Sequence, residues 1–89
     1  MAEPIVVELT YDMSKELGVP RFEVESADTV ADAVAAARER FGEKAEAFTR
    51  LSRVAAVAVN GVVVSHRKGM KTKLADGDTV AFLKAAAGG

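Results

Sequence analysis

The 89-residue sequence contains no cysteine and no tryptophan, and His66 is its single histidine. The absence of cysteine excludes disulfide bonds, thiolate nucleophiles and cysteine-ligated zinc or iron–sulfur sites. One histidine leaves no imidazole pair for a catalytic dyad or a histidine-based metal site. The sequence therefore lacks the side chains of thiol-dependent enzymes and of cysteine-ligated or histidine-based metal sites, and we expect no bound cofactor or metal.

A strong charge imbalance and long apolar runs are also missing. The formal net charge of −1 argues against electrostatic binding of the whole domain to nucleic acid or to an anionic membrane. No apolar run reaches the roughly 20 residues that a membrane helix needs, and the first residues do not have the pattern of a signal peptide. The hydrophobic fraction of 49% and the charged fraction of 28% are ordinary for a globular protein. We therefore expect one small soluble cytoplasmic domain without nucleic-acid or membrane partners.

Two strands are predicted in the first part of the chain. Residues 5–11 are apolar and β-branched, with every second residue from Ile5 to Tyr11 on one face. Residues 21–25 alternate between apolar and charged side chains, which is typical of a strand with one solvated face. The connection over 12–20 contains glycine and proline and has room for one helical turn. The two strands are expected to pair as a hairpin.

Two helices are predicted after these strands. Thr29 and Asp32 form the pattern of an N-terminal capping box, so the first helix is expected to begin there and to end at Phe41. Its apolar residues recur at helical spacing, and charged residues occupy the opposite side. A second, shorter helix is expected over 43–51.

Three further strands are predicted over 54–59, 62–64 and 80–83. Asn60-Gly61 is a strong hairpin signal for a type I′ turn between the first two of them, and 75–78 supplies a second turn. The element order predicts an α+β fold, with a mixed sheet of four to five strands and one main helix packed across one face.

The sequence ends in Gly88-Gly89, after the small residues that follow Lys84. Glycine lacks a Cβ, so it fits narrow channels that are closed to other residues. We expect residues 1–83 to form the domain and residues 84–89 to form a flexible tail. The carboxylate of such a tail can be threaded into the active site of another protein.

Three segments carry a resemblance to a known family: Ala58-Val59-Asn60-Gly61, residues 74–82 with the Asp76-Gly77-Asp78 turn, and Gly88-Gly89. Together they resemble the MoaD/ThiS family of ubiquitin-like sulfur-carrier proteins, especially its MoaD side, the small subunit of molybdopterin synthase. The resemblance implies the β-grasp (ubiquitin-like) fold. Two features differ from the family pattern: residues 84–87 contain no proline, and the basic connection over 65–73 is several residues longer than usual.

The resemblance implies that Gly89 is the working residue. In that family, a ubiquitin-activating-type enzyme uses ATP to adenylate the C-terminal carboxylate, and a sulfur donor then replaces AMP to leave a thiocarboxylate. Gly89 would carry the sulfur, and Gly88 would let the tail pass. The chain would be a protein cosubstrate and not an enzyme by itself. It would deliver sulfur to an acceptor enzyme, such as a molybdopterin synthase large subunit of which it would be the small subunit, in molybdopterin or thiamin-like cofactor biosynthesis. A sulfur-containing amino acid or natural product and tRNA thiolation stay open as other destinations of the sulfur.

A partner-binding patch is expected on the outer face of the sheet. Val80 and Phe82 alternate inward in the last strand, which leaves Leu83 outward beside the tail. The resemblance assigns Tyr11, Val63 and Leu83 to a hydrophobic patch that docks the activating and acceptor enzymes, and Phe82 is included with them. An exposed apolar cluster on a small domain usually marks an interaction site.

Two other functions remain open. A protein modifier would use the same activated glycine to form isopeptide bonds with target lysines. A non-covalent β-grasp interaction module would need no chemistry at Gly89. The basic segment over 65–73 is interpreted as a solvated loop, and Asp76 and Asp78 as turn-forming residues.

Overall fold

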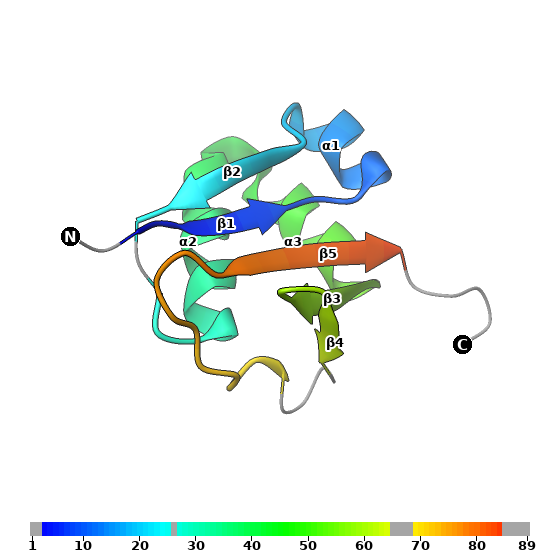
Figure 1. The fold of residues 1–89 in the computed structure, drawn as a ribbon. Coiled ribbons are helices and arrows are strands. Elements are labelled where there is room, and N and C mark those ends of the chain that lie inside the picture. The colour runs from blue at the N-terminus through cyan, green and yellow to red at the C-terminus, as the bar shows by residue number, and fades with distance from the viewer. Residues whose placement is uncertain (1–2, 26, 65–68, 85–89) are drawn as a thin grey trace.

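A computed structural model describes residues 3–25, 27–64 and 69–84, which form a mixed five-stranded sheet and a layer of helices (Figure 1). The helices α2 and α3 cover one face of the sheet, and the other face carries no helix of the described chain. In chain order, the elements are β1 (Ile5–Glu8), α1 (Tyr11–Leu17), β2 (Arg21–Val24), α2 (Val30–Phe41), a 3-10 turn (Gly42–Lys44), α3 (Ala45–Arg53), β3 (Ala55–Val59), β4 (Val62–Val64) and β5 (Thr79–Lys84).

The strand order β2-β1-β5-β3-β4 places the last strand in the centre of the sheet. β5 runs parallel to β1 and antiparallel to β3, and the two outer pairs are antiparallel. A parallel pair needs a long crossover connection, and the segment with α2 and α3 lies within that connection. The arrangement confirms the predicted α+β class with a mixed sheet and a helix across one face.

The structure corrects the first predicted strand. β1 ends at Glu8, and Tyr11 is the first residue of α1 instead of the last residue of a strand. The Oγ1 of Thr10 accepts a hydrogen bond from the amide of Met13 at 3.1 Å, and Gly18 ends the helix in the left-handed conformation with φ 87°. This cap satisfies an amide that would otherwise have no partner, so the helix replaces the alternating pattern.

The two helices that cover the sheet lie close to their predicted positions. The Oγ1 of Thr29 accepts a hydrogen bond from the Asp32 amide at 3.3 Å, and α2 ends at Phe41 as expected. The segment predicted as a helix over 43–51 is a 3-10 turn followed by α3, which continues to Arg53. None of the helices in the described ranges has the length and apolar character of a membrane span.

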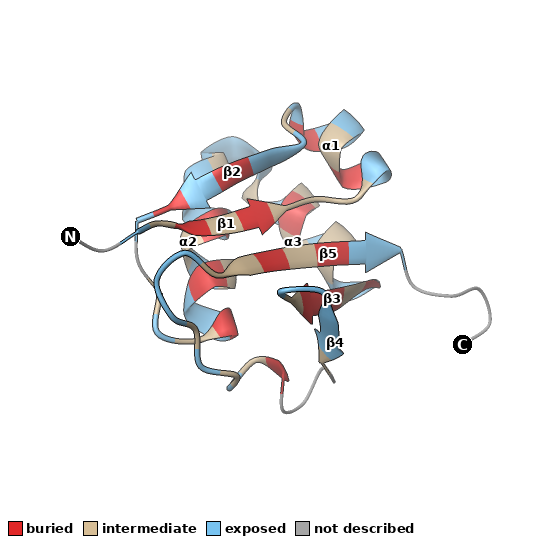
Figure 2. Cartoon of the chain, in the orientation of Figure 1, coloured by how far each residue is buried: buried red, intermediate tan, exposed pale blue. Residues whose placement is uncertain are grey.

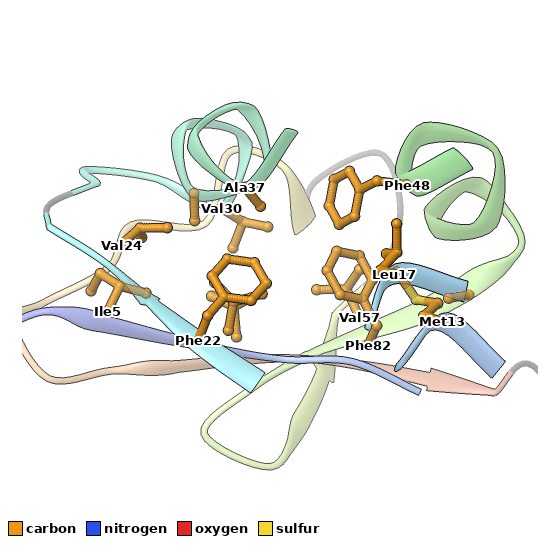
Figure 3. Close-up of a cluster of buried hydrophobic side chains, with 14 residues drawn as sticks. Ile5, Met13, Leu17, Phe22, Val24, Val30, Ala37, Phe48, Val57 and Phe82 are labelled. Carbon is orange, nitrogen blue, oxygen red and sulfur yellow. The ribbon is translucent and has the colours of Figure 1, made fainter. Parts of the chain in front are cut away.

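A chain of four phenylalanine rings joins the helix layer to the sheet. The ring centroids of Phe22 and Phe41 lie 5.3 Å apart, those of Phe41 and Phe48 lie 5.4 Å apart, and those of Phe48 and Phe82 lie 5.7 Å apart. The first and last pairs are edge-to-face, a favoured geometry for aromatic rings. Figure 3 shows Phe48 reaching from the helix layer toward Phe82, with Leu17 beside them. The rings therefore fix α2 and α3 against β2 and β5.

Candidate functional site

The uncovered face of the sheet has an alanine-rich centre. The strand register pairs Ala58 with Ala81, and Ala56 with Leu83. Successive residues of a strand point to opposite faces, and Phe82 points into the core, so its neighbours Ala81 and Leu83 face away from the helices. β3 and β5 thus present small side chains on the face that no helix covers.

Val63 lies on this same face. It pairs with Ala58 across the β3–β4 ladder, and Ala58 pairs in turn with Ala81. Val63 is 61% exposed and Leu83 is 41% exposed, and Figure 2 shows β4 and the end of β5 as exposed segments. The predicted outward orientation of Leu83 is confirmed. We call the accessible part of this surface the open-face patch, and its residues are Ala56, Val63, Ala81 and Leu83; Ala58 lies between them but is buried, with 2% of its surface exposed.

Phe82 does not belong to the open-face patch. Its side chain is only 3% exposed, and its ring packs edge-to-face on Phe48 in the core. A side chain beneath the helix layer cannot contact a partner while the protein is folded, so its assignment as a partner-binding residue is wrong. Phe82 contributes by holding β5 in place, with Leu83 on the opposite face.

Tyr11 is exposed, but it lies in α1 and not in the sheet. Its side chain is 75% exposed, and the Nζ of Lys15 lies 5.5 Å from the centre of its ring. Its chain neighbours Thr10 and Asp12 line a depression together with Lys84, the last residue of β5. Tyr11 is therefore at the end of the molecule where β5 ends, as Figure 1 shows for α1.

We call this depression the tail-root pocket. Its volume of about 230 Å³ is smaller than the range typical of small-molecule sites, so it suits a protein side chain better than a cofactor. Gly88 and Gly89, the predicted working residues, lie outside the described residues, as does His66 in the basic loop. The lining residues of the pocket are Thr10, Asp12, Met13, Leu51, Val54, Ala55 and Lys84.

Hydrogen bonds join the two predicted turns, the one at Asn60-Gly61 and the one over residues 75–78. The Nδ2 of Asn60 donates a hydrogen bond to the Oδ1 of Asp78 at 3.0 Å, and the amide of Thr79 donates to the Oδ1 of Asn60 at 2.9 Å. The Oδ2 of Asp78 accepts from the Ala75 amide at 2.8 Å. Asn60 and Gly61 have φ of 50° and 86°, as a type I′ turn requires.

This network fixes the register between the β3–β4 hairpin and β5. The hydrogen bond from the Ala75 amide, followed by that from the Asn60 side chain, lowers the pKa of Asp78 below its ordinary value. A slip of one residue would turn every side chain of β5 to the other face. Asp78 is thus a turn-forming residue, as predicted, and its turn helps to keep Leu83 on the open face.

Sequence reasoning missed two exposed valines. Val54 is 71% exposed because β3 begins at Ala55 and leaves it in the preceding turn. The apolar run over 54–59 gave no sign of this boundary. Val62 is 67% exposed in β4. Within the ranges that the structure describes, no group of three or more histidine and acidic side chains is placed to hold a metal ion.

The sequence matches the ThiS family over residues 15–89. No curated protein matches it significantly. Among solved structures, it is similar to small archaeal modifier protein 1 from Methanosarcina acetivorans, with a TM-score of 0.75, 19% identity and coverage of 100% of this chain and 99% of that chain.

Two further similar structures are protein complexes. One is the BexX/CysO complex from Amycolatopsis orientalis, with a TM-score of 0.71, 27% identity and coverage of 96% of this chain and 99% of the matched chain. The other is the complex of subunits 1 and 2 of the molybdopterin-converting factor from Helicobacter pylori 26695, with a TM-score of 0.66, 21% identity and coverage of 97% and 99%.

These similarities agree with the ubiquitin-like sheet and helix layer described above. The matched solved chains are covered almost completely, so the likeness extends over the whole domain. The family match alone covers most of the sequence and includes β5, the open-face patch and the last two glycines. The chain belongs to the ThiS family, within the MoaD/ThiS group of ubiquitin-like sulfur-carrier proteins.

Proposed function

We propose that the chain carries sulfur as a thiocarboxylate on Gly89. The observation that carries this proposal is the ThiS family match, which extends through residue 89 and so includes Gly88-Gly89. The proposal requires Gly89 to be the terminal residue of the working protein, since its free carboxylate is the reacting group. Gly88 would let the tail pass through a narrow channel of the partner. Because Lys84 belongs to β5, the tail starts after Lys84, one residue later than predicted.

The geometry of the described domain supports delivery of this tail. β5 occupies the centre of the sheet and ends at Lys84, directly after Leu83 of the open-face patch. A partner that contacts Leu83 is therefore within a few residues of Gly89. Two of the similar solved structures contain a second protein, which supports docking of a partner on this domain.

The proposed chemistry needs an activating enzyme and ATP. A carboxylate oxygen of Gly89 attacks the α-phosphorus of ATP and releases pyrophosphate, which leaves an acyl-adenylate. A sulfur nucleophile then attacks the carbonyl carbon and releases AMP, and the product is a thiocarboxylate. The partner, a ubiquitin-activating-type enzyme, binds the ATP, so the carrier works without a resident cofactor and acts as a cosubstrate in the cytoplasm. The acceptor is an enzyme such as a molybdopterin synthase large subunit.

Intact-mass spectrometry tests the proposal directly. Incubation with the adenylating enzyme, ATP and sulfide should raise the mass of the chain by the difference between sulfur and oxygen, and fragmentation should place the gain on Gly89. Deletion of Gly89, or addition of one residue after it, should abolish the gain, and Gly88→Ala should slow it. Absence of both adenylate and thiocarboxylate with every such enzyme encoded in the same genome would contradict the carrier function.

A protein modifier is the second candidate function. The domain is similar to small archaeal modifier proteins from Methanosarcina acetivorans and Haloferax volcanii, and this similarity is the reason for the second candidate. At 19% identity, the similarity concerns the fold. A modifier would form isopeptide-linked adducts on lysines of other proteins in cells, whereas a carrier would form none. If extension of the C-terminus left function intact, a non-covalent interaction module would replace both.

A further inference from the structure

A second depression lies on the helix side of the molecule, away from the open-face patch. It is formed by the C-terminal half of α2, the outer side of α3 and the turn that follows α3. Its surface is mostly apolar, although its rim is charged. We call it the arginine groove, and its lining residues are Arg38, Ala45, Glu46, Thr49, Arg50, Arg53 and Val54.

The groove concentrates positive charge on a chain whose formal net charge is −1. It contains three arginines and one carboxylate, that of Glu46. Arg50 has an acidic partner outside the groove, since its guanidinium lies 3.6 Å from the carboxylate of Glu16. Arg38 and Arg53 form no ion pair with any residue in the described part of the chain. Two guanidinium groups are therefore available to a carboxylate from outside.

The other arginines within the described ranges, Arg21 and Arg40, have partners of their own. Arg40 lies 4.9 Å from the centre of the Phe22 ring, and Arg21 lies 4.0 Å from Glu8. Arg38 and Arg53 differ from them because they border an apolar depression without an internal partner. A guanidinium can bind a carboxylate through two parallel hydrogen bonds, which gives geometric specificity as well as energy.

The exposed apolar side chain in the groove is that of Val54. This β-branched side chain is 71% exposed at the turn between α3 and β3. Val54 also lines the tail-root pocket with Lys84, so the arginine groove and the base of the tail share one residue. A segment bound in the groove would therefore lie next to the point where β5 ends, while the open-face patch stays uncovered.

We propose that the arginine groove docks an acidic and apolar segment of a partner protein, with carboxylates on Arg38 and Arg53 and an apolar side chain on Val54. Charge complementarity identifies this occupant. A polyanion such as nucleic acid fits less well, because Glu46 lies in the groove, no aromatic side chain lines it for base stacking, and the domain is not basic. The proposal does not depend on the chemistry at Gly89.

The test is an NMR titration of the isotope-labelled protein with an amphipathic peptide built from leucine and glutamate. Amide shifts should concentrate at Thr49, Arg53 and Val54. Two matched peptides control for chemistry, one with lysine in place of each glutamate and one with serine in place of each leucine. Both should bind roughly tenfold more weakly or worse, because each lacks one of the two contacts.

Matched variants sharpen the result. Arg38→Glu with Arg53→Glu should weaken binding of the acidic peptide by about tenfold or more, and Val54→Ser should also weaken it. Lys71→Glu with Lys73→Glu makes the same change in net charge elsewhere and should leave binding unchanged. Circular dichroism should show that all variants are folded, which is expected because these side chains are exposed.

Several outcomes would overturn the proposal. Equal binding of the lysine peptide would remove the role of the arginines, and shifts confined to Val63 and Leu83 would move the site to the open-face patch. Absence of binding would show that the groove has no such ligand. Tighter binding to phosphatidylserine vesicles, lost in Arg38→Glu with Arg53→Glu, would assign the groove to a membrane surface instead of a protein. None of these outcomes depends on thiocarboxylate formation at Gly89.

Discussion

The two faces of the sheet differ in what lies over them. One face is closed by α2 and α3, and its aromatic side chains interlock with those of the helices. The other face carries Val63 and Leu83 on either side of small alanines, and no described helix covers it. Because side chains alternate along a strand, β5 serves both faces with adjacent residues. Core packing and exposed surface thus come from neighbouring positions of one strand, Phe82 and Leu83.

The largest expected effect is on the covered face. Phe82→Ala should lower the free energy of unfolding by about 3–5 kcal/mol, because it removes a buried ring and leaves a cavity beside Phe48. Urea denaturation followed by circular dichroism measures this change. Leu83→Ala is the matched control on the open face and should cost well under half as much. Equal losses at the two positions would show that the faces do not divide their roles.

A charge on the open face should instead affect binding. Leu83→Glu should leave the domain folded but weaken binding to the adenylating enzyme by roughly ten- to a hundredfold, since a charge buried in an apolar contact must lose its water. Isothermal titration calorimetry measures the affinity. Ala31→Glu places the same charge on an exposed helical position and should bind normally. Unfolding of Leu83→Glu would mean that this side chain supports the core.

The fold could be predicted from the sequence because its signals are local. The capping residue Thr29, the Asn60-Gly61 turn and the alternation in β2 each act over a few residues, and each lies where it was expected. The first strand was predicted too long because Tyr11 continues the alternating pattern. The Oγ1 of Thr10 instead caps a helix that begins at Tyr11, so Tyr11 is helical despite the alternating pattern.

The surfaces were harder to predict because they depend on contacts between distant segments. Leu83 was correctly placed outward from the alternation in its own strand. Phe82 could not serve as a contact residue once Phe48 covered it, and that contact joins β5 to α3. The arginine groove combines Arg38 of α2 with Arg53 of α3, which no local spacing connects. The exposure of Val54 could not be predicted, because it depends on β3 beginning one residue later, at Ala55.

A smaller effect is expected from the hydrogen bonds that hold β5 in register, because the register decides which side chains of β5 face the helices. Asn60→Gly keeps the positive φ that the turn requires but removes both side-chain hydrogen bonds to the 78–79 segment. The free energy of unfolding should fall by about 1 kcal/mol, as measured by urea denaturation. Asn60→Asp keeps an acceptor but sets a second carboxylate beside Asp78, so it should be less stable than Asn60→Gly at neutral pH. An unchanged stability in Asn60→Gly would show that backbone pairing alone holds the register.

The smallest expected effect is the dependence of this turn on pH. Hydrogen bonds from the Ala75 amide and the Asn60 side chain lower the pKa of Asp78 in the folded protein, so the folded state favours the ionised carboxylate. Its contribution to stability is therefore present at neutral pH and is lost as the pH falls below about 4 toward the lowered pKa.

Urea denaturation at several values between about pH 6 and pH 3 measures this contribution. Asp78→Asn should unfold more easily at pH 6, and its free energy of unfolding should decline less than that of the unaltered protein as the pH falls. Asp76→Asn is the control, because Asp76 is exposed in the same turn and accepts no hydrogen bond from the described residues. It should retain the decline of the unaltered protein. If Asp78→Asn retained the full decline as well, other carboxylates would account for it, and the turn would hold β5 in register independently of the charge on Asp78.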